Sequence, residues 1–158
     1  MSDKSETLTT LESKYEEFRA RISGLSADAY DEVWLGEWSL AQLLAHMAGW
    51  FGEMTVGLKR VGQGERPTPD GTDYTDEDAW NAKFAASASP GPAALTNFDG
   101  AYARYRDAAK ALPEDKFGTD PETGKMRIGA RLLDGPGIHH FDEHHPQIDE
   151  WLSTRHRG

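Results

Sequence analysis

Four of the six histidines in this 158-residue chain lie within seven residues, from position 139 to position 145. Imidazole nitrogens are common ligands for zinc and other transition-metal ions, so this cluster raises the question of a metal site. His140 and His144 are four residues apart, which places them about 6 Å apart along a helix axis and on one face. Both side chains could therefore reach one ion. No Glu directly follows the first histidine, so the segment does not match the HExxH signature of metalloproteases.

The apolar residues of this segment indicate which histidines face the interior of the protein. At about 100° per residue, three of them share one helix face: Phe141, Ile148 and Leu152. His140 flanks this face, and His144 lies on or beside it. His145 falls within the face, where packing explains it better than metal binding. His139 points towards solvent together with Glu143.

One alternative ligand pair stays open. His139 and Glu143 have the same spacing as His140 and His144, and they would complete a set of two histidines and one carboxylate. This choice would require the helix to turn by roughly 80° and to expose its apolar face. We therefore expect His139, His145 and His156 not to bind the ion.

His46, on an earlier helix, is the candidate for a third ligand, although a partly buried, hydrogen-bonded histidine would equally explain its position. His46 lies about 100° from the centre of the apolar stripe of its helix, on the side of Trp50 and Glu53. It thus flanks the core as His140 does, and helical bundles build metal sites from inward side chains on facing helices. Three neutral histidines without a fourth protein ligand describe an open site, in which water completes the coordination shell.

Helical spacing of apolar residues predicts four long helices and one short helix. Their expected bounds are near residues 4–24, 39–62, 75–86, 91–112 and 136–154. Ser39 with Gln42 fits a capping box at the start of the second long helix. Asp134 fits the N-cap of the last helix, with Pro136 near its first turn.

The connections between these helices indicate how the bundle is arranged. The link over residues 63–89 is long enough to run the length of a bundle, so the second and third long helices could lie parallel. The short helix within it would start behind Thr75 or Asp76. Residues 113–135 form a second polar link. Because no stretch alternates like a half-buried strand, the predicted class is an all-α four-helix bundle, in a single domain over residues 1–158.

Composition narrows the classes of partner. A net charge of −10 disfavours nucleic acid and anionic membrane surfaces. No apolar run reaches the roughly 20 residues of a membrane-spanning helix. Without cysteine, the chain has neither disulfides nor a thiolate ligand. We expect a cytoplasmic protein that acts on a small molecule.

The motifs of the chain resemble those of the DinB-like metal-binding four-helix bundles, which include the ClbS/DfsB group and the metal-binding domain of mycothiol-dependent maleylpyruvate isomerase. The matching motifs are W-S-x(6)-H ending at His46, D-x-x-N from Asp78 to Asn81, and H-x(3)-H from His140 to His144 followed by I-x-x-W. The resemblance implies that the three histidines bind one divalent ion. It also implies a long crossover between the second and third long helices, an up-down-down-up bundle and a homodimer. Some relatives have Glu in place of the first histidine of the last helix.

Two chemistries follow from this resemblance: transfer or isomerisation that depends on a small cellular thiol, and hydrolysis of a reactive metabolite. Zinc and nickel are the first metals expected, and iron is also compatible with imidazole ligands. Any thiol must come from outside the chain. The catalytic groups are unknown beyond a metal-bound water or thiol. The alternative is a protein that binds or sequesters a ligand at the metal without turnover.

Several further residues are candidates for a substrate pocket. Three tryptophans could form an aromatic wall for an apolar ligand: Trp38, Trp50 and Trp80. Asn81 is expected in the same pocket, and Glu53 could orient a ligand or water. Arg131 could bind an anionic substrate. Ordinary packing would also explain each tryptophan, and solvent exposure would explain Glu53 and Arg131.

Overall fold

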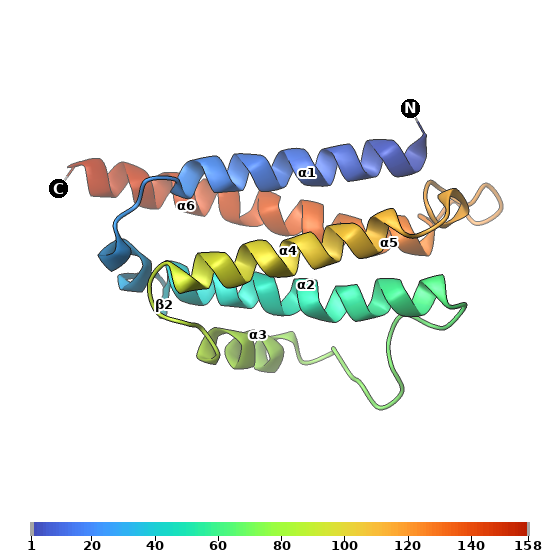
Figure 1. The fold of residues 1–158 in the computed structure, drawn as a ribbon, viewed down its shortest axis with the longest axis horizontal. Helices are drawn as coiled ribbons and strands as arrows, with labels where there is room; N and C mark the ends of the chain where they lie inside the picture. The colour runs from blue at the N-terminus through green and yellow to red at the C-terminus, as the bar shows by residue number, and fades with distance from the viewer. Residues whose placement is uncertain (1, 158) are drawn as a thin grey trace.

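A computed structural model describes residues 2–157, and it consists mainly of four long helices that lie side by side (Figure 1). These helices are α1 (Asp3–Ile22), α2 (Leu40–Gly62), α4 (Ala93–Lys110) and α6 (His140–Arg157). In Figure 1, α1 and α6 run in one direction and α2 and α4 in the other. The predicted all-α bundle with a parallel second and third long helix is confirmed. The side chain of His156 lies outside the described part, so the expectation for it is not addressed.

Helix α2 begins where the capping box was predicted. The backbone N–H of Gln42 donates to Oγ of Ser39 at 3.3 Å, and the N–H of Ser39 donates to Oε1 of Gln42 at 3.0 Å. A short hairpin precedes the helix, formed by β1 (Val33–Leu35) and β2 (Trp38–Ser39). The expectation of no strand missed this hairpin because strands of three and two residues are too short to show alternation. The hairpin places Trp38 at the base of α2.

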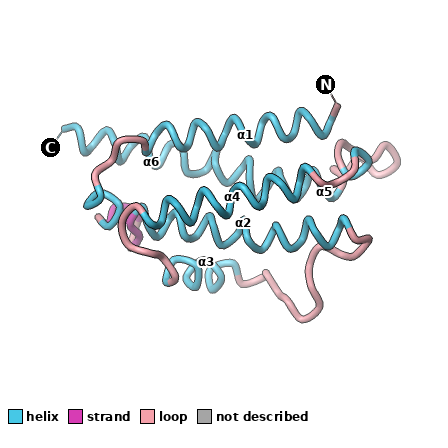
Figure 2. The backbone as a smooth tube through the Cα atoms, viewed as in Figure 1, coloured by secondary structure: helices cyan, strands magenta, loops and turns pink. Residues whose placement is uncertain are grey.

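The long crossover carries α3 (Glu77–Ala86), which packs against the outside of α2 (Figure 2). The predicted cap is present, since Oδ1 of Asp76 accepts from the N–H of Ala79 at 3.2 Å. Gly49 on α2 allows the close approach of α3, because a Cβ atom there would lie only 2.2 Å from the ring of Phe84. The crossover thereby brings a third element beside the histidines.

The last helix begins earlier than predicted. Its path starts with α5 (Ile128–Leu133), continues through a π-helical turn (Asp134–His139) and becomes α6 without a break. The expectation of an N-cap at Asp134 is therefore wrong, and the polar link ends at Arg127. Proline and glycine usually end an α-helix, but here the wider π-helical turn accommodates them.

Packing around this turn accounts for its stability. The hydroxyl of Tyr105 donates to the carbonyl of Leu132 at 2.5 Å. Gly137 lies against α1 and α4, where an added Cβ would be 2.8 Å from both Leu11 and Tyr105. The turn sits directly before His140, so it determines how α6 presents its first histidine.

Aromatic side chains fill the centre of the bundle. Phe18, Phe51, Phe98 and Phe141 are fully buried, and their closest ring centroids lie 5.2 to 5.9 Å apart. The burial of Phe141 confirms the predicted inner face of α6. His145 is buried against the rings of Phe18 and Phe141, which confirms its predicted place within the inner face.

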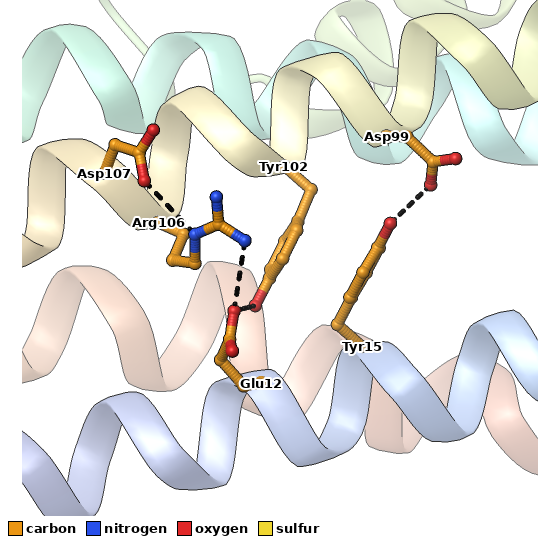
Figure 3. A network of polar contacts seen from close by, with 6 residues as sticks. All are labelled: Glu12, Tyr15, Asp99, Tyr102, Arg106 and Asp107. Atoms are coloured by element: carbon orange, nitrogen blue, oxygen red, sulfur yellow. Dashed lines mark hydrogen bonds and ion pairs between the residues drawn. The ribbon is translucent and has the colours of Figure 1, made fainter.

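A polar network joins α1 to α4 (Figure 3). We call it the α1–α4 network, and it comprises Glu12, Tyr15, Asp99, Tyr102, Arg106 and Asp107. The hydroxyl of Tyr15 donates to Asp99 at 2.5 Å, and the hydroxyl of Tyr102 donates to Glu12 at 3.2 Å. Arg106 donates to the same Glu12 oxygen at 3.3 Å. The rings of Tyr15 and Tyr102 stack at 3.8 Å.

Candidate metal centre

Three histidines from two helices, α2 and α6, meet at one point. His46 comes from α2 and His140 and His144 from α6, and one ligand atom of each lies within 4.8 Å of the others. The Nε2 atoms of His46 and His140 are 2.8 Å apart. Two imidazole nitrogens on one tetrahedral zinc ion would be on the order of 3.4 Å apart, so little movement would admit an ion.

Burial keeps these histidines neutral. Each is less than a tenth exposed. Loss of hydration and, to a smaller extent, proximity to His144 lower the pKa of His46 to about 4. The same causes lower the pKa of His140 to about 3, and burial also lowers the pKa of His144. Near neutral pH the rings carry no charge, which is the form that binds metals.

Hydrogen bonds orient the two histidines of α6. Nδ1 of His144 lies 2.7 Å from Oε1 of Gln147, an acceptor, so the proton of this ring is on Nδ1 and Nε2 carries the lone pair. The backbone carbonyl of Pro136, in the π-helical turn, hydrogen-bonds to His140 and raises its pKa against the effect of burial. Partners of this kind fix the ring orientation of metal-binding histidines.

Two buried ring nitrogens of this centre have no hydrogen-bond partner among the described residues. They are Nδ1 of His46 and Nε2 of His144. The other such nitrogens in the described chain belong to Trp34, His145 and Trp151, which do not line the cavity described next. An unpaired buried polar group costs about 1–3 kcal/mol. An ion between the three rings would satisfy Nε2 of His144, so the residues present fit a divalent metal.

A cavity of about 530 Å³ opens beside the three histidines, between α2, α3 and the start of α6. Trp38, Trp50 and Tyr74 form its aromatic wall. Its polar lining includes Asn81, whose Oδ1 accepts from Nε1 of Trp50 at 2.7 Å. A cavity of this size takes a small molecule next to the metal position.

The residues predicted for the pocket divide into two groups. Trp50 and Asn81 line the cavity. Trp80 and Glu53 support it from behind: Nε1 of Trp80 donates to the carbonyl of Asp73 at 2.8 Å, and Glu53 accepts from the hydroxyl of Tyr74 at 2.9 Å. Glu53 therefore orients the wall of the cavity.

The alternative ligands lie outside the triad. The side chain of His139 is 66% exposed, and its Nδ1 is 3.2 Å from a carboxylate oxygen of Asp134. His139 and Glu143 are both exposed, as the sequence predicted, and they also line the cavity. Arg131 is exposed and does not line the cavity.

Sequence reasoning missed three residues of this region: Tyr74, Glu77 and Gln147. The first two come from the crossover, whose path over the bundle is not encoded in any local pattern. Gln147 had a usable signal, because residues three apart on a helix are neighbours and Gln147 follows His144 by three.

Comparisons with known proteins agree with this fold. A family model described as the DinB superfamily matches residues 10–145. A protein from Streptococcus pneumoniae has a similar structure, with a TM-score of 0.78, 12% identity and coverage of 97% of this chain and 92% of that one. No curated protein sequence matches the chain.

Two further structures are similar along nearly their whole length. DfsB, a sibling lethal factor precursor, has a TM-score of 0.76 at 19% identity and covers 98% of each chain. The colibactin self-resistance protein ClbS, solved in complex with double-stranded DNA, has a TM-score of 0.69 at 15% identity and covers 95% of each chain. Likeness at such low identity concerns the fold alone.

Proposed function

The chain belongs to the DinB superfamily, and from this premise we propose that it is a divalent-metal-dependent enzyme that acts on a small reactive metabolite. The reaction is a thiol-dependent transfer or isomerisation, or a hydrolysis. The observation that carries the proposal is the group of three buried, neutral histidines with an unpaired Nε2 of His144 beside a cavity. Unlike the unpaired Nε2 of His145, this atom belongs to a group of three histidines whose ligand atoms lie within 4.8 Å of one another.

His46, His140 and His144 would hold one zinc or nickel ion, with iron as a further candidate. When bound, the ion supplies Lewis acidity, which lowers the pKa of a coordinated water or thiol and polarises an oxygen. The rest of the work falls to the chain itself. Gln147 and the carbonyl of Pro136 orient the ligands, and the aromatic wall excludes water from the apolar part of a substrate. Since the chain has no cysteine, a reacting thiol is supplied from outside.

The proposed partners are small molecules. No described helix is long and apolar enough to span a membrane. The net charge of −10 supports the prediction of no nucleic-acid partner, whereas the presence of DNA in the ClbS structure argues against it. A cytoplasmic location and a homodimer also stay predictions. Sedimentation that gives a monomer at micromolar concentration would refute the dimer.

The proposed activity is tested by product release. Metal-loaded and chelated protein would be incubated with epoxide and activated-carbonyl electrophiles, with and without cysteine-containing thiols, and the products identified by mass spectrometry. We expect turnover with the loaded protein and with His139→Ala, and none with His144→Ala or after chelation. Stoichiometric retention of a compound without release would favour the sequestering alternative. If neither turnover nor retention is observed, the proposal is overturned.

A further inference from the structure

The charged groups around the cavity are mostly of one sign. Glu77 at the start of α3 and Glu143 on α6 both line it, and Glu53 adds a carboxylate behind Tyr74. His139 also lines it and is already paired with Asp134. None of the described residues that line the cavity is Lys or Arg.

The histidine end of the cavity is different, because its three rings are neutral and would carry a divalent cation. The cavity would thus be positive at its floor and negative near its opening. A ligand that matches this arrangement carries an electron-pair donor at one end and a positive charge at the other. A ligand with a second negative charge would place it beside Glu77 and Glu143 without any lining cation to balance it.

We propose that the cavity selects a small amine-bearing molecule, with a Lewis-basic donor atom directed at the three histidines and an ammonium group held between Glu77 and Glu143. This inference rests on the proposed metal site, and it names the substrate class of that site. It also replaces the expectation that Arg131 receives an anionic substrate, since Arg131 lies outside the lining.

Helix α6 sets the distance between the histidine end of the cavity and its acidic end. Glu143 follows His140 by three residues and precedes His144 by one, so the carboxylate and the ligand rings lie within about one helical turn, roughly 5–6 Å. In the ligand, the donor atom and the ammonium group should therefore be separated by only two or three bonds.

The aromatic wall supports the same charge preference. The faces of Trp and Tyr rings attract cations, and Trp38, Trp50 and Tyr74 all line the cavity. Tyr74 is held by its hydrogen bond to Glu53, and Trp50 by its bond to Asn81. The wall is thus fixed before any ligand binds, which reduces the entropy lost on binding.

Three small thiols of similar size test the inference, because they differ mainly in the charge at the far end: 2-aminoethanethiol, 2-mercaptoethanol and 3-mercaptopropionate. Each would be titrated into the full-length protein loaded with Co²⁺, and the thiolate-to-cobalt charge-transfer absorption would give its Kd. The amine also changes the acidity of its own thiol. The decisive quantity is therefore the Kd of 3-mercaptopropionate divided by the Kd of 2-aminoethanethiol. This ratio is compared between the wild type and the variant Glu77→Gln/Glu143→Gln.

We expect 2-aminoethanethiol to bind most tightly to the wild type and 3-mercaptopropionate most weakly. The ratio should shrink about fivefold in the double variant, as is typical of exposed ion pairs, and it should also shrink at high salt. The matched control is Asp142→Asn, which removes an exposed acid of α6 that pairs with Lys14 and does not line the cavity. It should leave the ratio unchanged.

The possible failures are separable. If no cobalt spectrum forms, the metal site itself is wrong and the proposed function fails with it. If cobalt binds but the ratio is the same in wild type and double variant, or if no thiol binds the loaded protein, the metal site stands and the amine preference is refuted.

Discussion

The α1–α4 network, whose charged side chains are partly exposed, and the buried histidine cluster differ in how far their polar atoms find partners within the chain. In the α1–α4 network, each hydroxyl donates to a carboxylate, and Arg106 pairs with Glu12 and Asp107 (Figure 3). In the histidine cluster, Nε2 of His46 faces Nε2 of His140, and Nε2 of His144 has no partner. The hydroxyls and the guanidinium of the network are paired within the described chain, whereas the cluster leaves buried ring nitrogens without a partner.

This difference separates structural from functional polar groups. A satisfied network stabilises the packing of α1 on α4 and has nothing left to bind a ligand. Buried unpaired nitrogens reduce the stability of the metal-free protein and retain their lone pairs for an ion. The same bundle therefore contains one polar region that holds helices together and one that suits the proposed metal site.

The largest expected effect is stabilisation by metal. Added zinc or nickel should raise the free energy of unfolding by about 4 kcal/mol at a thousandfold excess over Kd. Denaturant unfolding with and without metal measures this gain. His139→Ala should keep it, and His46→Ala should lose it. Equal stabilisation of His46→Ala would show that the metal acts elsewhere.

Acid should destabilise the metal-free protein through the same histidines. Folding lowers the pKa of His46 from 6.5 to about 4 and that of His140 to about 3, so the unfolded chain takes up protons first as the pH falls. The free energy of unfolding should decrease as the pH falls from 6.5 to about 3, and one histidine should account for on the order of 3 kcal/mol of this decrease. The variant His46→Gln should show a shallower acid slope, and an identical slope would contradict the account.

The network should respond at the opposite end of the pH scale. Burial and the bond to Asp99 raise the pKa of Tyr15 to about 12 from 10.0. The stability that this contributes is complete below pH 10.0 and is lost as the pH rises towards 12. Unfolding of Tyr15→Phe compared with wild type between these pH values would reveal the difference.

A smaller effect is expected from the residue that orients His144. Gln147→Leu removes the acceptor for Nδ1 and should weaken metal binding by about 10- to 100-fold. Gln147→Glu keeps an acceptor and should retain tight binding, which is the matched control. Competition with a chromophoric chelator measures both affinities. Unchanged affinity in the leucine variant would leave Gln147 with a packing role only.

The smallest effect on the metal should come from the network. Tyr15→Phe near neutral pH should lower the free energy of unfolding by about 1 kcal/mol and leave the metal affinity unchanged. Loss of metal affinity in this variant would break the separation between the two regions.

The sequence predicted the four long helices, the Ser39 cap and the inner face of α6 because each depends on local chemistry or on helical periodicity. That periodicity also placed His46, His140 and His144 beside the core. It could not predict the π-helical turn, since Gly135 and Pro136 act as breakers in most local contexts. The part of the cavity formed by Tyr74 and Glu77 was also beyond reach, because it depends on where the crossover docks.

X-ray absorption spectroscopy on protein purified without a histidine tag and loaded with zinc or nickel tests the metal triad most directly. We expect one ion per chain, with three imidazole nitrogens at about 2.0–2.2 Å and solvent oxygen completing the shell. His46→Ala and His144→Ala should lose this stoichiometric ion, and His139→Ala should keep it. Full metal occupancy in His46→Ala or His144→Ala would contradict the central claim.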